Sequence, residues 1–117
     1  MDRDKTEKEL ERLVKEINDT ERAILRKKEA VDMLKRDIDK VDTMLMESIT
    51  NEESSGKPKF SNVEKRKAEF IKRIACDAEH HAMELTLQQM QHDTNELVIY
   101  LQDLKLQFRT IEILSRI

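Results

Sequence analysis

The chain has 117 residues, of which 40% are charged and 3% aromatic, with one glycine, one proline and a net charge of −3. So few turn formers and aromatic side chains argue against a sheet or a compact core of many elements, and the regular spacing of aliphatic residues argues against disorder. The acidic balance argues against a nucleic-acid-binding protein, and no apolar run reaches the roughly 18 residues of a membrane span. We therefore expect an all-α protein.

The first predicted element is a long helix over about residues 5–49. Thr6 and Glu9 have the spacing of a capping box at its start, although Asp2 or Asp4 would also serve. One row of residues seven apart is wholly aliphatic, which is typical of a coiled-coil seam. The companion row is only half apolar and so weakens the case for a parallel dimer. The aliphatic row, assigned to the core, is Leu10, Ile17, Ile24, Val31, Ile38 and Leu45.

A loop is predicted next, over about residues 50–61. This stretch holds the single Gly56 and the single Pro58 among serine, threonine and asparagine residues. After it, Ser61 and Glu64 have the spacing of a second capping box, with Ser61 as the N-cap.

The second predicted helix covers about residues 62–116. Its apolar stripe drifts between about Cys76 and Leu87, a register break that we expect to change the winding without ending the helix. Beyond the break, apolar residues alternate at spacings of four and three, as a coiled-coil face requires. The core residues assigned here are Leu87, Met90, Leu97, Leu101, Leu104, Phe108 and Ile111.

The distribution of charge favours an antiparallel hairpin of these two helices. Residues 74–104 contain no lysine or arginine, whereas residues 7–37 are rich in both. A chain that reverses near residues 55–56 would lay these stretches side by side and would set Lys27 near Met83 and Glu84. Opposite charges select orientation more than they add stability. The alternatives are a loop that links helices of different molecules, or a parallel dimer.

A second apolar row on the second helix has no partner within such a hairpin. Residues two apart on a helix point about 200° apart, so Ile99 faces away from Leu97 and Leu101. Soluble chains rarely leave such a row exposed. We therefore expect homodimerisation into a four-helix assembly, or capture of another coiled-coil protein. The residues assigned to this face are Leu85, Ile99, Leu106, Ile113 and Leu114.

Basic residues crowd the predicted hairpin tip. Most charged tips are simply solvated, but this one could touch an acidic protein surface or anionic lipid. Nucleic-acid stacking has little support, since only Phe60 and Phe70 lie nearby. The candidate residues for an acidic partner are Lys57, Lys59, Lys65, Arg66, Lys67, Lys72 and Arg73.

No pattern of residues predicts catalysis, a cofactor, a metal or a small-molecule substrate. Cys76 and His80 are spaced i, i+4, but the first helix has no histidine or cysteine to complete a zinc site. The Gly56–Lys59 stretch lacks the spacing of a phosphate-binding loop. A two-helix rod has no pocket that could desolvate a reacting group. We therefore expect a protein that is not an enzyme.

The sequence thus predicts a single coiled-coil segment over 1–117, expected to be part of a larger cytoplasmic protein. Its expected role is oligomerisation, scaffolding or regulation in a cytoskeletal, motor, centrosomal or trafficking protein. The alternative function is a helical-hairpin binding module that docks a protein partner, such as a small GTPase, through the exposed face of the second helix.

Overall fold

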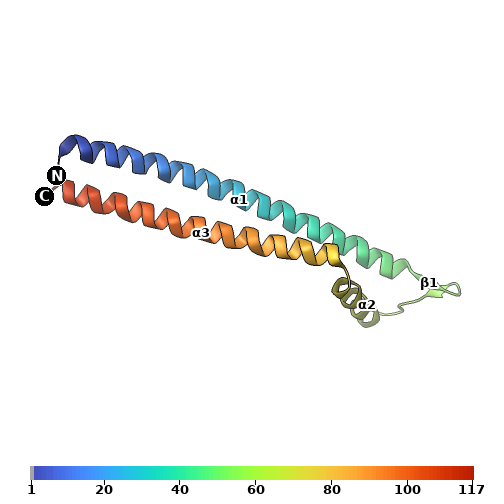
Figure 1. Cartoon of the computed structure of the whole chain (residues 1–117). Helices are drawn as coiled ribbons and strands as arrows, with labels where there is room; N and C mark the ends of the chain where they lie inside the picture. Colours follow the sequence, from blue (N-terminus) through green and yellow to red (C-terminus); the bar gives the residue numbers. More distant parts are fainter. Residues whose placement is uncertain (1) are drawn as a thin grey trace. The chain divides into compact units, whose positions relative to one another are not determined.

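The computed structural model describes residues 2–117, which form three helices and one short β-hairpin (Figure 1). The all-α class expected from the sequence is confirmed. The helices are α1 (Arg3–Asn51), α2 (Val63–Ala75) and α3 (Ala78–Ser115), and the strands are β1 (Glu53–Ser54) and β2 (Lys57–Pro58). The chain divides into two compact units, and both α1 and α3 take part in each.

Unit 1 combines the chain up to Ala30 with Met90–Ile117. Its two helical segments run antiparallel: Thr6 lies at the same end of the pair as Leu114, and further along the pair the Tyr100 hydroxyl donates a 3.1 Å hydrogen bond to Glu16. An antiparallel coiled-coil hairpin fits this packing. Three aliphatic side chains of this unit are buried: Leu13, Ile24 and Leu104. The other predicted core residues of the unit are half-buried, and they are Leu10, Ile17, Met90, Leu97, Leu101, Phe108 and Ile111.

Unit 2 is Val31–Gln89 and contains the chain reversal. From α1 it buries Val31, Ile38 and Ile49, and it half-buries Leu45. From α3 it half-buries Leu87. Ile49 is completely covered although it belongs to neither heptad row, because it lies where α1 ends and the chain turns.

The reversal uses a tight two-residue turn where the sequence predicted only a loop. Ser54 pairs with Lys57 in an antiparallel register, which leaves Ser55 and Gly56 as the turn. Their φ angles are 56° and 77°, the left-handed values that a type I′ hairpin turn requires at both positions. Glycine adopts this conformation without steric cost, and Pro58 is tolerated because it lies on an edge strand.

Three expectations from the sequence are wrong. The first concerns the start of α2, where Asn62 and not Ser61 is the N-cap. The Asn62 side chain accepts a 2.8 Å hydrogen bond from the backbone N–H of Lys65. Serine and asparagine are almost equally good caps, so a shift of one residue costs little.

The second concerns the expected continuous helix over 62–116, which is two helices. The chain leaves the helical conformation at Cys76, and α3 starts after Asp77. The Asp77 carboxylate accepts hydrogen bonds from the backbone N–H groups of Glu79 at 3.0 Å and His80 at 3.1 Å. Asp77 is therefore an N-cap, and an N-cap makes a new helix start favourable. Figure 1 shows that α2 does not continue the line of α3.

The expected pairing register is also wrong. Asp42 contacts His80 in unit 2, so the two helices pair about a midpoint near residue 61 and not 55–56. Lys27 accordingly belongs to unit 1 with residues beyond Met90, and it does not face Met83 or Glu84. The cause is α2, whose residues lie outside the α1–α3 pairing and shift every later residue along α3.

Candidate functional site

The strongest candidate site is an apolar row on α3 in unit 1, formed by Ile99, Leu106 and Ile113 and here named the outward row. Leu106 is 62% exposed, and Ile99 and Ile113 are each more than half exposed. Leu104, two residues away, is only 2% exposed, because the two positions point about 200° apart on the helix. The same helix thus presents one apolar face to α1 and another to solvent.

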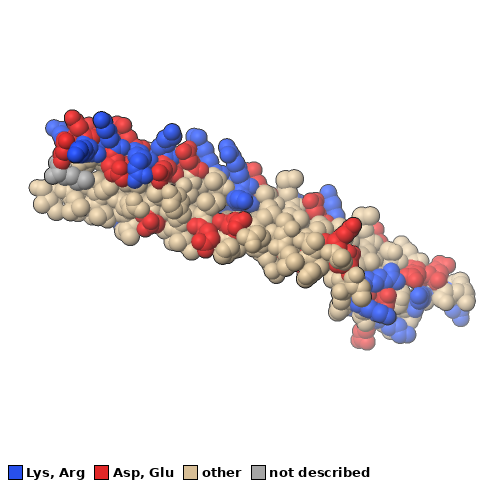
Figure 2. All heavy atoms as spheres, viewed as in Figure 1, with Lys and Arg blue, Asp and Glu red and all other residues tan. Residues whose placement is uncertain are grey.

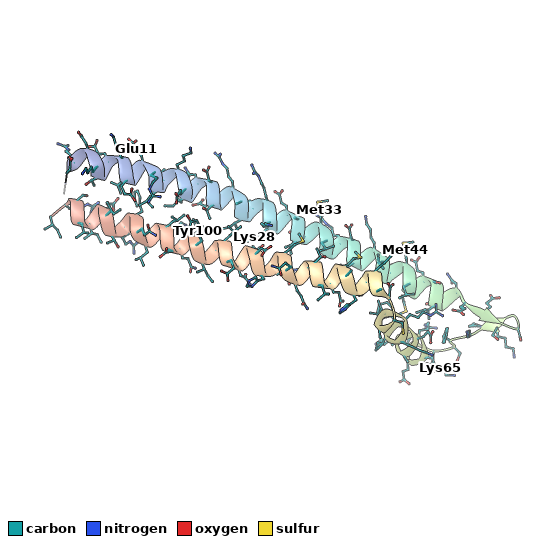
Figure 3. All side chains as sticks on the ribbon, in the orientation of Figure 1. Glu11, Lys28, Met33, Met44, Lys65 and Tyr100 are labelled. Carbon is teal, nitrogen blue, oxygen red and sulfur yellow. The ribbon has the colours of Figure 1, made fainter. Side chains whose placement is uncertain are left out.

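Leu114 extends this exposed surface, and Tyr100 lies at its edge toward α1. Figure 3 shows Tyr100 on the side of α3 toward α1, where its hydroxyl is bonded to Glu16 and its ring stays about half exposed. The Glu16 carboxylate accepts this hydrogen bond and repels the phenolate, so the pKa of Tyr100 is raised. Leu114 is more than half exposed and lines a shallow groove of about 500 Å³ beside Thr6, Leu10 and Ile117.

Charge is distributed unevenly around unit 1. In the view of Figure 2, charged side chains crowd α1, whereas the surface of α3 is mostly uncharged. The sequence explains the contrast, because Asp93 and Glu96 are the only charged residues between Leu85 and Gln102. Only Ile99 of the outward row lies in this nearly uncharged stretch, whereas Asp103 and Arg109 flank Leu106. An apolar row with charged residues at its edges is the usual composition of a protein-binding surface.

Leu85, the remaining residue predicted for this face, lies in unit 2. It is about half exposed, and Ile71 on α2 is exposed as well. Exposed methionines also mark the other helix of unit 2, where Figure 3 shows Met33 and Met44 on the outer side of α1. Every residue predicted for the partner face is therefore accessible.

The basic tip predicted from the sequence lies wholly in unit 2, but its members differ in what they do. Arg73 donates to Glu52 at 2.5 Å and to Glu69 at 2.9 Å, and Lys59 contacts Glu52 at 3.2 Å. These two partners hold the pKa of Glu52 below its ordinary value. Arg66 donates to the backbone oxygen of Phe60 at 3.4 Å. Arg73 and Arg66 therefore tie α2 to the segments that flank the β-hairpin, and Lys59 joins the two ends of the hairpin itself.

The other four basic residues of the tip point to solvent. They are exposed, and none of them forms a salt bridge with any residue between 2 and 117. These residues are Lys57, Lys65, Lys67 and Lys72.

A buried histidine in unit 2, with two carboxylates beside it, was missed by the sequence reasoning. His80 is 3% exposed, its Nε2 lies 2.8 Å from Asp42 Oδ1, and its Nδ1 lies 3.7 Å from Glu84 Oε1. Recognising Asp77 as an N-cap would have placed His80 in the first turn of a new helix, but nothing local to the sequence identifies Asp42 as its partner.

The geometry also separates the residues considered for a metal. Cys76 is exposed at the end of α2, whereas His80 is buried against α1. Within residues 2–117, no three His, Cys, Asp or Glu side chains are grouped so that they could hold a metal ion. None of the helices in the described chain has the length and apolar composition to cross a membrane.

Comparison of the chain with protein families, with curated proteins and with solved structures finds no match. Function is therefore argued from the outward row and its surroundings.

Proposed function

We propose that this chain is a non-enzymatic coiled-coil oligomerisation segment in which two copies pair through the outward rows of α3 to form a four-helix assembly. In this role it sets the spacing and the copy number of a larger cytoplasmic scaffold, cytoskeletal, motor or trafficking protein. The observation that carries the proposal is the exposure of Ile99, Leu106 and Ile113 on a helix whose opposite face is already packed.

The free energy gained by covering these side chains supports a partner for the outward row. Fully covering an exposed aliphatic side chain is worth about 1.5–3 kcal/mol, so a side chain that is half exposed gains roughly 1–2 kcal/mol. A symmetric dimer covers each residue of the row in both copies, so the gain is counted twice. That gain must exceed an association cost of about 4 kcal/mol or more. The row therefore supports a dimer, of moderate affinity, that a concentration series at tens of micromolar would detect.

The charges beside the row favour a second copy as the partner. Asp103 and Arg109 are exposed three residues before and three residues after Leu106, which sets them about 60° to either side of the row. Glu96 and Arg116 widen the same acidic and basic edges. A two-fold interface uses one patch twice and must be complementary to itself. With the two α3 helices parallel, the acidic edge of each copy meets the basic edge of the other.

Sedimentation equilibrium tests this proposal. The wild-type chain is expected to sediment at twice its 13.9 kDa mass at tens of micromolar. The double variant Leu106→Asp, Ile113→Asp is expected to raise the dissociation constant at least about 100-fold, because it removes four apolar contacts per dimer and buries like charges. Far-UV circular dichroism should stay unchanged, since both positions are exposed.

A matched control uses the other helix of unit 1. Leu25 is 61% exposed, almost the same as Leu106, and Val14 is also exposed. Leu25→Asp with Val14→Asp should leave the dimer intact. A wild-type monomer at these concentrations contradicts self-association and favours the alternative, a hairpin that docks a different protein through the same row. A dimer that survives Leu106→Asp, Ile113→Asp places the interface elsewhere.

A further inference from the structure

The tip of unit 2 has a charge opposite to that of the whole chain. Residues 57–73 contain seven basic and two acidic residues, whereas the chain has a net charge of −3. Of the two acidic residues, Glu69 is already bound by Arg73 at 2.9 Å. The tip is therefore a local positive surface on an acidic protein.

Internal ion pairing accounts for only part of the positive charge. Arg73 and Lys59 share the Glu52 carboxylate, and Arg66 donates a hydrogen bond to the neutral backbone carbonyl of Phe60. The remaining lysines are exposed, and none has a salt-bridge partner anywhere in residues 2–117. These four, here named the free lysines, are Lys57, Lys65, Lys67 and Lys72.

The free lysines of α2 share its exposed side with aliphatic side chains. Ile71 is 68% exposed and Val63 is more than half exposed, and α2 contains no buried residue at all. At 100° per residue, Lys67 lies about 40° to one side of Ile71 and Lys72 about 100° to the other. Figure 3 shows Lys65 projecting from the same short helix. Glu64, seven residues before Ile71, lies about 20° from it, and Lys67 lies between Ile71 and Val63. The exposed side of α2 is therefore amphipathic, with aliphatic and lysine side chains interleaved, one carboxylate and a net positive charge.

We infer that α2 and the β-hairpin turn dock on the surface of an anionic phospholipid membrane. Interfacial helices of this kind place aliphatic residues at the level of the lipid headgroups and hold lysines over the negative lipids. Lysine suits this role because it is a flexible point charge that needs no fixed partner geometry. The proposal is independent of self-association, since it uses different residues in a different unit.

Other partner classes fit the tip less well. Recognition of an acidic protein is usually anchored by arginine, tyrosine or tryptophan, but both arginines of the tip are already engaged and the tip has neither aromatic type. Single-stranded nucleic acid needs exposed rings for stacking, whereas Phe60 and Phe70 are half-buried.

Vesicle co-sedimentation tests the inference with the full chain. Vesicles of phosphatidylcholine and phosphatidylserine in equal amounts should bind the chain, and pure phosphatidylcholine vesicles should not. Raising the ionic strength from about 0.1 M to about 1 M shortens the screening length from about 10 Å to about 3 Å and should release it. Replacing all four free lysines with glutamine should weaken binding at least about 100-fold, and Ile71→Ser should weaken it several-fold at constant charge.

The matched control removes the same charge from α1. Lys5, Lys8, Lys28 and Lys35 are also exposed, and their replacement by glutamine should leave vesicle binding unchanged. An equal loss in this control would show that only net charge matters and would overturn the assignment to α2. No binding to phosphatidylserine vesicles would overturn it as well, and so would tighter binding to polyglutamate or polyuridylate through the free lysines. Leu106→Asp, Ile113→Asp should keep vesicle binding, so failure of one proposal is distinguishable from failure of the other.

Discussion

In unit 1 both long helices contribute buried aliphatic side chains, Leu13 and Ile24 from α1 and Leu104 from α3. In unit 2 the buried aliphatic residues come from α1 alone, and the buried side chain that α3 supplies is His80, bound to Asp42. Apolar packing has no directional requirement, whereas a hydrogen bond depends on the distance and angle between its donor and acceptor. One hairpin can therefore be held together by two kinds of chemistry along its length, and substitutions can separate them.

The largest effect is expected in the apolar seam of unit 1. Leu104→Ala should lower the free energy of unfolding by about 2–5 kcal/mol, because it leaves a cavity where a covered leucine was. Thermal unfolding in dilute solution measures this loss. Leu106→Ala is the control on the opposite face and should change stability by less than about 0.5 kcal/mol in the monomer. Equal losses for the two variants would mean that the inner and outer faces of α3 are wrongly assigned.

The next effect is expected in the polar contact of unit 2. His80→Ala should cost about 1–3 kcal/mol, because it removes the partner of the half-buried Asp42 and opens the space that the ring fills. Chemical denaturation measures it, and the adjacent exposed His81→Ala is the control, expected within about 0.5 kcal/mol of wild type. No loss in the His80 variant would show that this contact does not hold unit 2.

Substitution in the hairpin turn is expected to have a smaller effect on stability. Gly56 has a φ of +77° and open space around its Cα, so Gly56→Ala suffers from backbone strain and not from a clash. We expect a loss of about 1 kcal/mol. Ser55→Gly is the opposite change at the neighbouring left-handed position, and it should leave stability unchanged or slightly higher. If Gly56→Ala is neutral, the turn is not of type I′.

The smallest effect concerns the ion pair between Arg73 of α2 and Glu52, which precedes β1. Arg73 and Lys59 lower the pKa of Glu52 from its ordinary 4.5 in the folded chain. The contribution of the pair is therefore complete above pH 4.5 and is lost as the pH falls through the lowered folded pKa. Arg73→Ala should raise the pKa of Glu52 toward 4.5 in an NMR titration and flatten the acid side of the stability profile. An unchanged titration would contradict the pairing.

Helical geometry made the two faces of α3 predictable. Seven-residue steps assign Leu97 and Leu104 to one face and Ile99 and Leu106 to the other, and exposure in the structure follows that division. This inference needs only the helix period, which is a local property of the chain. The tip was predictable as a basic region for the same reason, since it is a run of residues close in sequence.

The features that could not be predicted depend either on residues far apart in the sequence or on alternatives that differ little in free energy. The burial of His80 requires Asp42, which lies 38 residues earlier in the chain. The start of α2 at Asn62 and not at Ser61 depends on a small difference between two good caps. The neutralisation of Arg73 by Glu52 requires the turn to bring residues 21 apart together, which composition alone cannot show.

The lack of any buried residue in α2 has a consequence for how the chain opens. A helix held by its caps, by the contacts of Arg73 with Glu52 and of Arg66 with Phe60, and by half-buried side chains such as Phe70 can separate from its surroundings at far less cost than a helix with a covered core. Backbone amides of Val63–Ala75 should therefore exchange with deuterated solvent well before those around Leu13 or Leu104. This element can rearrange on contact with a partner while the seams on α1 and α3 stay closed.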